Sequence, residues 1–145
     1  MLDYGVWTYP IVNLLHILGI ATLFGAVVVL DLRLMGVWRS TPLTAITTAA
    51  VPVATTGFLL AVLSGPCLLA TKALDYEQNP FLLGKFSAIG LGLANVIVLR
   101  RTAAWRAHTT RELSRVEARQ LAAIAGMSLV SWLTAVTAGR MLGYW

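Results

Sequence analysis

Long apolar stretches separated by short polar segments dominate the pattern along the chain. Four stretches carry few charged side chains, at about residues 7–30, 43–71, 81–99 and 115–142. A helix needs about 20 mostly apolar residues to cross the hydrocarbon core of a bilayer. The pattern therefore predicts an all-α integral membrane protein, in which a four-transmembrane-helix bundle forms one domain over residues 1–145.

Capping residues mark where two of these helices begin. Asn79 is followed by Pro80, which suits a capping side chain with proline at the first helical position. Ser114 stands three residues before Glu117, the spacing of a capping box. The third and fourth helices are therefore expected to start at these points, the fourth before its most apolar part.

The composition supports a membrane protein. Hydrophobic residues make up 58% of the chain and charged residues 12%, whereas soluble domains are about a quarter charged. The single cysteine, Cys67, excludes a disulfide within the chain. Because no basic segment precedes the first apolar stretch, we interpret that stretch as a retained helix and not as a signal peptide.

Basic residues predict the orientation of the helices. Arg33 and Arg39 follow the first helix, whereas Lys72 after the second is offset by Asp75 and Glu77. The connection after the third helix is the most basic, with Arg100, Arg101, Arg106, Arg111, Arg115 and Arg119. Cytoplasmic loops are enriched in Lys and Arg, so both termini are predicted to lie outside. The basic loop is expected to contact anionic membrane lipids, not nucleic acid.

Three basic residues fall inside the spans, where ionisable groups are costly and often functional. Counting helical rise from the outer boundary places His16 about 10 Å deep and Lys85 and Arg140 about 7 Å deep. Three helices thus bring basic groups to a similar level. Asp75, Glu77 or an anionic ligand is expected to supply the compensating charge.

Each of these residues also has a purely structural interpretation. His16 can donate a hydrogen bond to a carbonyl or a serine on the next helix. Lys85 and Arg140 lie close enough to the interface to extend outward. Asp31 and Arg33, at the inner end of the first helix, are expected to form a boundary cluster with lipid headgroups.

Small residues along the spans predict close helix packing. Gly19 and Gly25 on the first helix, Gly92 on the third and Ser128 on the fourth let backbones approach in lipid. Such contacts can form within the bundle or between protomers, so a homo-oligomer or a complex with another membrane protein is predicted. Trp132, inside the fourth span, is expected to face lipid or a partner.

Three segments resemble a family of small bacterial inner-membrane proteins known as a domain of unknown function. They are HILGIATLFGAVVVLDLRLMG (16–36), NPFLLGK (79–85) and SWLTAVTAGRMLGYW (131–145). The resemblance implies a bacterial inner membrane, periplasmic termini and family residues at His16, Asp31, Arg33, Asn79, Pro80, Lys85, Gly139 and Arg140. Family members often carry a second histidine where this chain has Leu99-Arg100-Arg101. A looser similarity to copper-resistance D-type membrane proteins does not extend to copper binding.

A redox-type protein that binds haem b or a quinone is the first functional hypothesis. A neutral imidazole is a usual axial ligand of haem, so His16 is the candidate ligand, with Lys85 and Arg140 facing the propionates. A histidine can also bond a quinone carbonyl. The same residue is the only strong metal-ligand candidate, because Cys67 and Met127 lie at other depths.

Transport of an anion or a proton is the first alternative, with Asn13, Asn95, Asp31 and Arg33 as pathway residues. An accessory subunit of a membrane complex is the second. No nucleophile–base pair, phosphate-binding glycine loop or zinc motif is present in the sequence. Autonomous catalytic activity is therefore not expected.

Overall fold

Helices account for nearly all of the described chain. The structure is a computed structural model that describes residues 4–71 and 78–144. Its long helices are α1 (Tyr4–Leu34), α2 (Leu43–Thr71), α4 (Pro80–Arg101) and α6 (Arg115–Leu142), with a short α5 (Ala103–Ala107). The four long helices are long and apolar enough to cross a membrane. The prediction of an all-α, multi-pass membrane protein is therefore confirmed.

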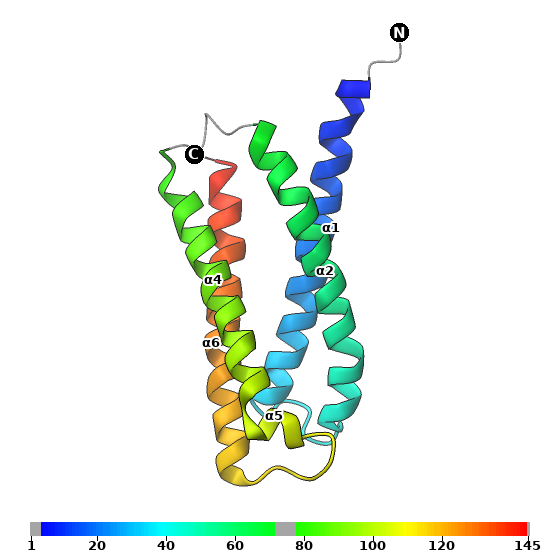
Figure 1. Ribbon diagram of the computed structural model, residues 1–145, viewed down its shortest axis with the longest axis vertical. Coiled ribbons are helices and arrows are strands. Elements are labelled where there is room, and N and C mark those ends of the chain that lie inside the picture. The colour runs from blue at the N-terminus through cyan, green and yellow to red at the C-terminus, as the bar shows by residue number, and fades with distance from the viewer. Residues whose placement is uncertain (1–3, 72–77, 145) are drawn as a thin grey trace.

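The helices form two hairpins that meet along one seam. α1 packs along α2, α4 packs along α6, and α1 packs against α6, whereas α2 and α4 hardly touch. Both chain ends lie at one end of the bundle, and α5 lies at the other (Figure 1). We call these the terminal end and the basic end. Because α2 and α4 do not close together, the bundle has an open side between them.

The predicted caps are present at the starts of α4 and α6. The Asn79 side chain accepts a hydrogen bond of 2.9 Å from the Phe81 amide. Ser114 and Glu117 make the two reciprocal bonds of a capping box. Glu117 also forms an ion pair of 2.6 Å with Arg111, and this hydrogen bond raises the pKa of the Arg111 guanidinium.

Glycines allow α1 and α2 to cross at close range. A Cβ atom added to Gly57 would lie 2.5 Å from the Leu23 amide nitrogen and 2.7 Å from the Gly19 carbonyl oxygen. Only glycine fits at such a crossing, where backbone faces backbone. The predicted role of small residues in helix packing is therefore confirmed for Gly19. Gly25 differs, because a Cβ there would meet nothing within 4 Å.

The most tightly packed part of the bundle lies at the basic end. Its buried side chains are Leu34, Leu99, Ala104, Leu121, Ile124 and Ala125. Elsewhere large apolar side chains point outward, and Leu63 and Leu83 are more than two thirds exposed. Lipid chains are as apolar as leucine, so this surface suits a bilayer. The core therefore fixes the halves of the helices near the basic end, where the buried Asp31, Thr47 and Asn95 lie.

Candidate functional site

His16 connects α1 to α2 in the half of the bundle near the terminal end. Its Nδ1 lies 2.9 Å from the Ser64 Oγ, and that hydroxyl donates to the Leu60 carbonyl at 2.6 Å. Because the Ser64 proton is directed at Leu60, the imidazole Nδ1–H donates to Ser64. This bond matches the structural interpretation predicted for His16. In the neutral ring it leaves the Nε2 lone pair free.

Lys85 approaches His16, whereas Arg140 does not join them. The Lys85 stem crosses α6, with its Cε 3.5 Å from the position that a Gly139 Cβ would occupy. Lys85 lies close enough to His16 for an electrostatic interaction between the two groups. Arg140 is exposed and donates from Nη2 to the Tyr144 hydroxyl at 2.6 Å. The structure thus brings together two of the three predicted basic residues.

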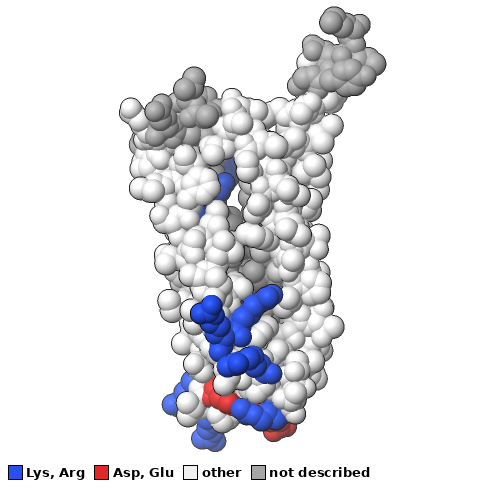
Figure 2. Space-filling view, viewed as in Figure 1, with Lys and Arg blue, Asp and Glu red and all other residues white. Residues whose placement is uncertain are grey.

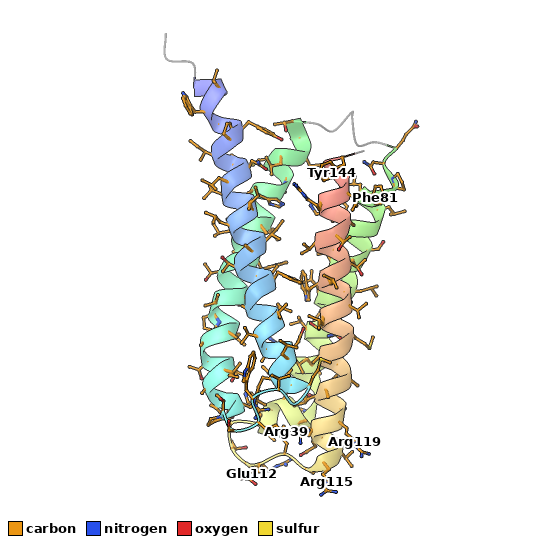
Figure 3. The ribbon with its side chains drawn as sticks, turned by 180° about the vertical axis from the view of Figure 1, so that it is seen from behind. Arg39, Phe81, Glu112, Arg115, Arg119 and Tyr144 are labelled. Carbon is orange, nitrogen blue, oxygen red and sulfur yellow. The ribbon has the colours of Figure 1, made fainter. Side chains whose placement is uncertain are left out.

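The third basic residue, Arg140, is held at the terminal end of the bundle by Tyr144, which follows α6. The Arg140 guanidinium lies 4.8 Å from the centre of the Tyr144 ring, and Figure 3 labels Tyr144 at the terminal end of α6. This position agrees with the predicted outward extension of Arg140. The proposed countercharges, Asp75 and Glu77, lie outside the described residues.

The predicted pathway residues do not form one line. Asn13 is half-buried on α1 in the half near the terminal end. Arg33 lies at the basic end, where its Nε donates to the Thr41 carbonyl at 2.9 Å. Asp31 and Asn95 are both buried. Of the four residues, only these last two share a site.

Asp31 points into the bundle and not toward lipid headgroups. It is 4% exposed, and its carboxyl group interacts with the Ser128 side chain of α6. Its second oxygen, Oδ2, is buried and has no hydrogen-bond partner. The expected boundary cluster with Arg33 is therefore wrong for Asp31, because the α1–α6 seam buries this face of α1.

Trp132 is also buried, contrary to the expectation that it faces lipid or a partner. It is 5% exposed and packs on Gly92, where an added Cβ would lie 2.9 Å from the indole ring. The missing side chain at Gly92 makes the space that the indole fills. The indole Nε1 is buried without a hydrogen-bond partner, although Trp Nε1 normally finds one.

Asp31, Asn95, Ser128 and Trp132 line one cavity of about 180 Å³. Asn95 donates from Nδ2 to the Ile124 carbonyl at 2.9 Å. The remaining walls are mostly apolar and come from α1, α2, α4 and α6, with Trp105 of α5. Buried polar atoms usually have partners, so a cavity lined by two residues with unpaired polar atoms is the candidate binding site.

The cavity reaches the surface on the open side of the bundle. Val51, Ala54 and Phe58 of α2 form one wall, and Leu93 and Val96 of α4 form the other. Figure 2 shows a crevice on this face, with Lys and Arg side chains gathered near its lower part and further basic surface inside its upper part. A ligand dissolved in the bilayer can therefore reach the cavity laterally, between α2 and α4.

Sequence reasoning did not place Ser128 and Trp132 in a site. They are four residues apart, so they lie on one face of α6, and Ile124 continues that face one turn earlier. This spacing is the sequence feature that places the two residues on the same face of the helix. Because the opposite face of α6 is also rich in apolar residues, the pattern did not show which face turns inward.

No metal centre is found within residues 4–71 and 78–144. No group of three or more His, Cys, Asp or Glu side chains converges there. Cys67 is exposed and directs its thiol at the Leu63 carbonyl, and Met127 is 65% exposed. Neither residue therefore approaches His16 in the way a shared site would need.

Comparison with known proteins adds no functional information. No protein-family model matches the chain, and no curated protein and no solved structure matches it. The resemblance to a domain of unknown function therefore stays a prediction. Function is argued below from the cavity and its surroundings.

Proposed function

We propose that this membrane protein binds a lipid-soluble quinone, with the quinone ring in the cavity and its isoprenoid tail passing between α2 and α4 into the bilayer. One observation supports this most directly. The Asp31 and Trp132 side chains line the same cavity, and each has a buried polar atom without a hydrogen-bond partner, Oδ2 and Nε1. A ligand with oxygen atoms on an apolar ring satisfies both groups.

The size of the cavity suits a single six-membered ring. An apolar protein cavity of about 150 Å³ can hold benzene, and this cavity measures about 180 Å³. A haem macrocycle is much larger. Arg140 is also turned toward Tyr144, away from the place of a propionate partner. His16, the predicted haem ligand, is also not among the residues that line the cavity, so this cavity suits a quinone and not haem b.

The polar atoms suit both redox forms of a quinone. The Trp132 indole nitrogen can only donate, so it pairs with a carbonyl oxygen or with the oxygen of a hydroxyl. The Asp31 carboxyl group accepts when ionised and donates when protonated. It can therefore pair with a quinol hydroxyl in the first state and with a quinone carbonyl in the second.

The open side of the bundle explains how the ligand enters. Ligand sites are typically apolar clefts with a few polar groups that fix orientation. Here the α2 and α4 walls are mostly apolar, with Thr55, Asn95 and Arg100 as their polar residues, and Asp31 and Trp132 lie on α1 and α6. The tail then stays in lipid while the ring reaches Asp31.

A binding titration in detergent tests this proposal. The probe is a decyl-substituted benzoquinone, and the signal is quenching of tryptophan fluorescence, to which Trp105 in the same cavity also contributes. Asp31→Leu and Trp132→Phe each remove one polar group at similar size. A hydrogen bond lost from a buried group costs about 1–3 kcal/mol, so each variant should bind about tenfold more weakly.

Thr134→Val is the matched control. Thr134 is exposed on α6, and its hydroxyl bonds the Val130 carbonyl of its own helix. This variant should bind like the wild type. Equal quinone affinity in the wild type, Asp31→Leu and Trp132→Phe would show that the quinone does not occupy this cavity, provided that both variants are helical and monodisperse.

A further inference from the structure

Three arginines lie at the basic end, where α4 ends and α5 follows. Arg100 lines the cavity and is exposed, and Arg101 follows it at the end of α4. Arg106 of α5 donates from Nη2 to the Arg101 carbonyl at 3.2 Å, which holds its guanidinium beside that helix end. Within the described ranges the ion pair found joins Arg111 to Glu117. The three arginines therefore have no carboxylate partner there.

An apolar wall continues from these arginines along the bundle. The residues that line it include Val51 and Phe58 on α2 and Leu93 and Val96 on α4. α2 and α4 hardly touch, so the space between them is open to lipid. Figure 2 shows basic side chains on both sides of the lower part of this crevice.

We propose that the crevice binds an anionic phospholipid, with its phosphate on Arg100 and Arg106 and one acyl chain between α2 and α4. A guanidinium presents paired N–H groups that match phosphate oxygens. Basic residues near an anionic leaflet attract its headgroups. The predicted orientation places the basic end at the cytoplasmic leaflet, where headgroup and arginines are at the same level.

Charge and shape together select this ligand. Free phosphate pairs with the arginines but leaves the apolar wall uncovered. A zwitterionic lipid covers the apolar wall, but its headgroup also brings a cationic group close to the arginines. Trp105 lines the same cavity, and indole rings favour the headgroup level. The site goes beyond the proposed quinone function. Both ligands place a hydrocarbon chain between α2 and α4, but the phosphate contacts the rim whether or not a quinone ring contacts Asp31.

Native mass spectrometry of the full chain tests the proposal. The protein is released from nanodiscs with equal amounts of phosphatidylglycerol and phosphatidylcholine, and retained lipids are counted. We expect the wild type to retain phosphatidylglycerol preferentially. Arg100→Gln/Arg106→Gln should bind it about thirtyfold more weakly and retain correspondingly less, because two guanidinium–headgroup attractions are lost.

Arg115→Gln/Arg119→Gln is the control, because it removes the same charge from the exposed start of α6, away from the cavity lining (Figure 3). It should retain lipid like the wild type. Equal loss in both double variants, or equal retention of the two lipids by the wild type, would overturn the proposal.

Two further measurements keep the test independent of folding and of the quinone. Titration of the wild type with inorganic phosphate should not displace phosphatidylglycerol, and displacement would identify an ion site in place of a lipid site. Arg100 lines the quinone cavity, whereas Arg106 is not among its lining residues; the single variant Arg106→Gln should therefore lose phosphatidylglycerol and still bind the decyl-benzoquinone. Loss of lipid with quinone binding intact supports the lipid site whatever the outcome for Asp31 and Trp132.

Discussion

The crossing of α1 and α2 gives a sharp prediction about stability. In Gly57→Ala the new methyl group would lie 2.5 Å from the Leu23 amide nitrogen and 2.7 Å from the Gly19 carbonyl oxygen. Ordinary contacts begin at 3.4 Å, so the helices must separate by about 0.9 Å at this point. Both contacts are backbone atoms, which cannot rotate away. The strain must therefore move a whole helix.

The expected cost follows from two opposing terms. Overpacking of a well-packed interior costs about 1–3 kcal/mol. Replacing glycine by alanine inside a helix returns about 0.8–1.0 kcal/mol of helix propensity. We therefore expect Gly57→Ala to lower the free energy of unfolding by about 1 kcal/mol, within a range of about 0–2 kcal/mol.

Unfolding by sodium dodecyl sulfate in mixed micelles, followed by circular dichroism, measures this change. Gly25→Ala is the control on the same helix pair, because a Cβ at Gly25 meets nothing within 4 Å. It should be neutral or slightly more stable. If Gly57→Ala unfolds at the same detergent fraction as Gly25→Ala, the close crossing is not present.

Two further predictions concern His16 and Gly92. A double-mutant cycle between His16→Ala and Ser64→Ala should give a coupling free energy of about 0.5–1.5 kcal/mol, because it removes one interhelical hydrogen bond within the membrane. Gly92→Ala should displace the Trp132 indole, shift its fluorescence maximum and weaken quinone binding, because an added Cβ would lie 2.9 Å from the ring.

Each of these predictions has its own contradicting result. Additive effects of the two single substitutions would show that His16 and Ser64 do not interact. Gly90→Ala is the control for Gly92, since a Cβ at Gly90 meets nothing within 4 Å. Identical spectra and quinone affinity in Gly90→Ala and Gly92→Ala would contradict the packing of Trp132 on Gly92.

The spans and caps could be predicted because they depend on local composition. The apolar stretches, the Asn79 cap and the capping box at Ser114 follow from hydropathy and from backbone groups that need partners. The membrane orientation and the oligomeric state stay predictions.

The inward faces of the helices could not be predicted in the same way. In lipid both the packed face and the exposed face of a helix are apolar, so periodicity does not separate them. Counting the helical rise from the outer boundary gave Lys85 and Arg140 the same depth. It did not show toward which side of its helix each side chain points. For the same reason Asp31 was expected at the headgroups and Trp132 in lipid, whereas both line the cavity.

The central claim is that a quinone ring occupies the cavity between Asp31 and Trp132. Photolabelling with an azido-quinone, followed by peptide mass spectrometry, locates the ring directly. We predict label on the cavity-lining parts of α4 and α6, around Leu93–Leu99 and Ile124–Trp132, and loss of this label when unmodified decyl-benzoquinone is in excess. Label confined to exposed apolar residues outside these ranges, such as Leu83 and Leu133, or label that excess quinone does not displace, would contradict the account.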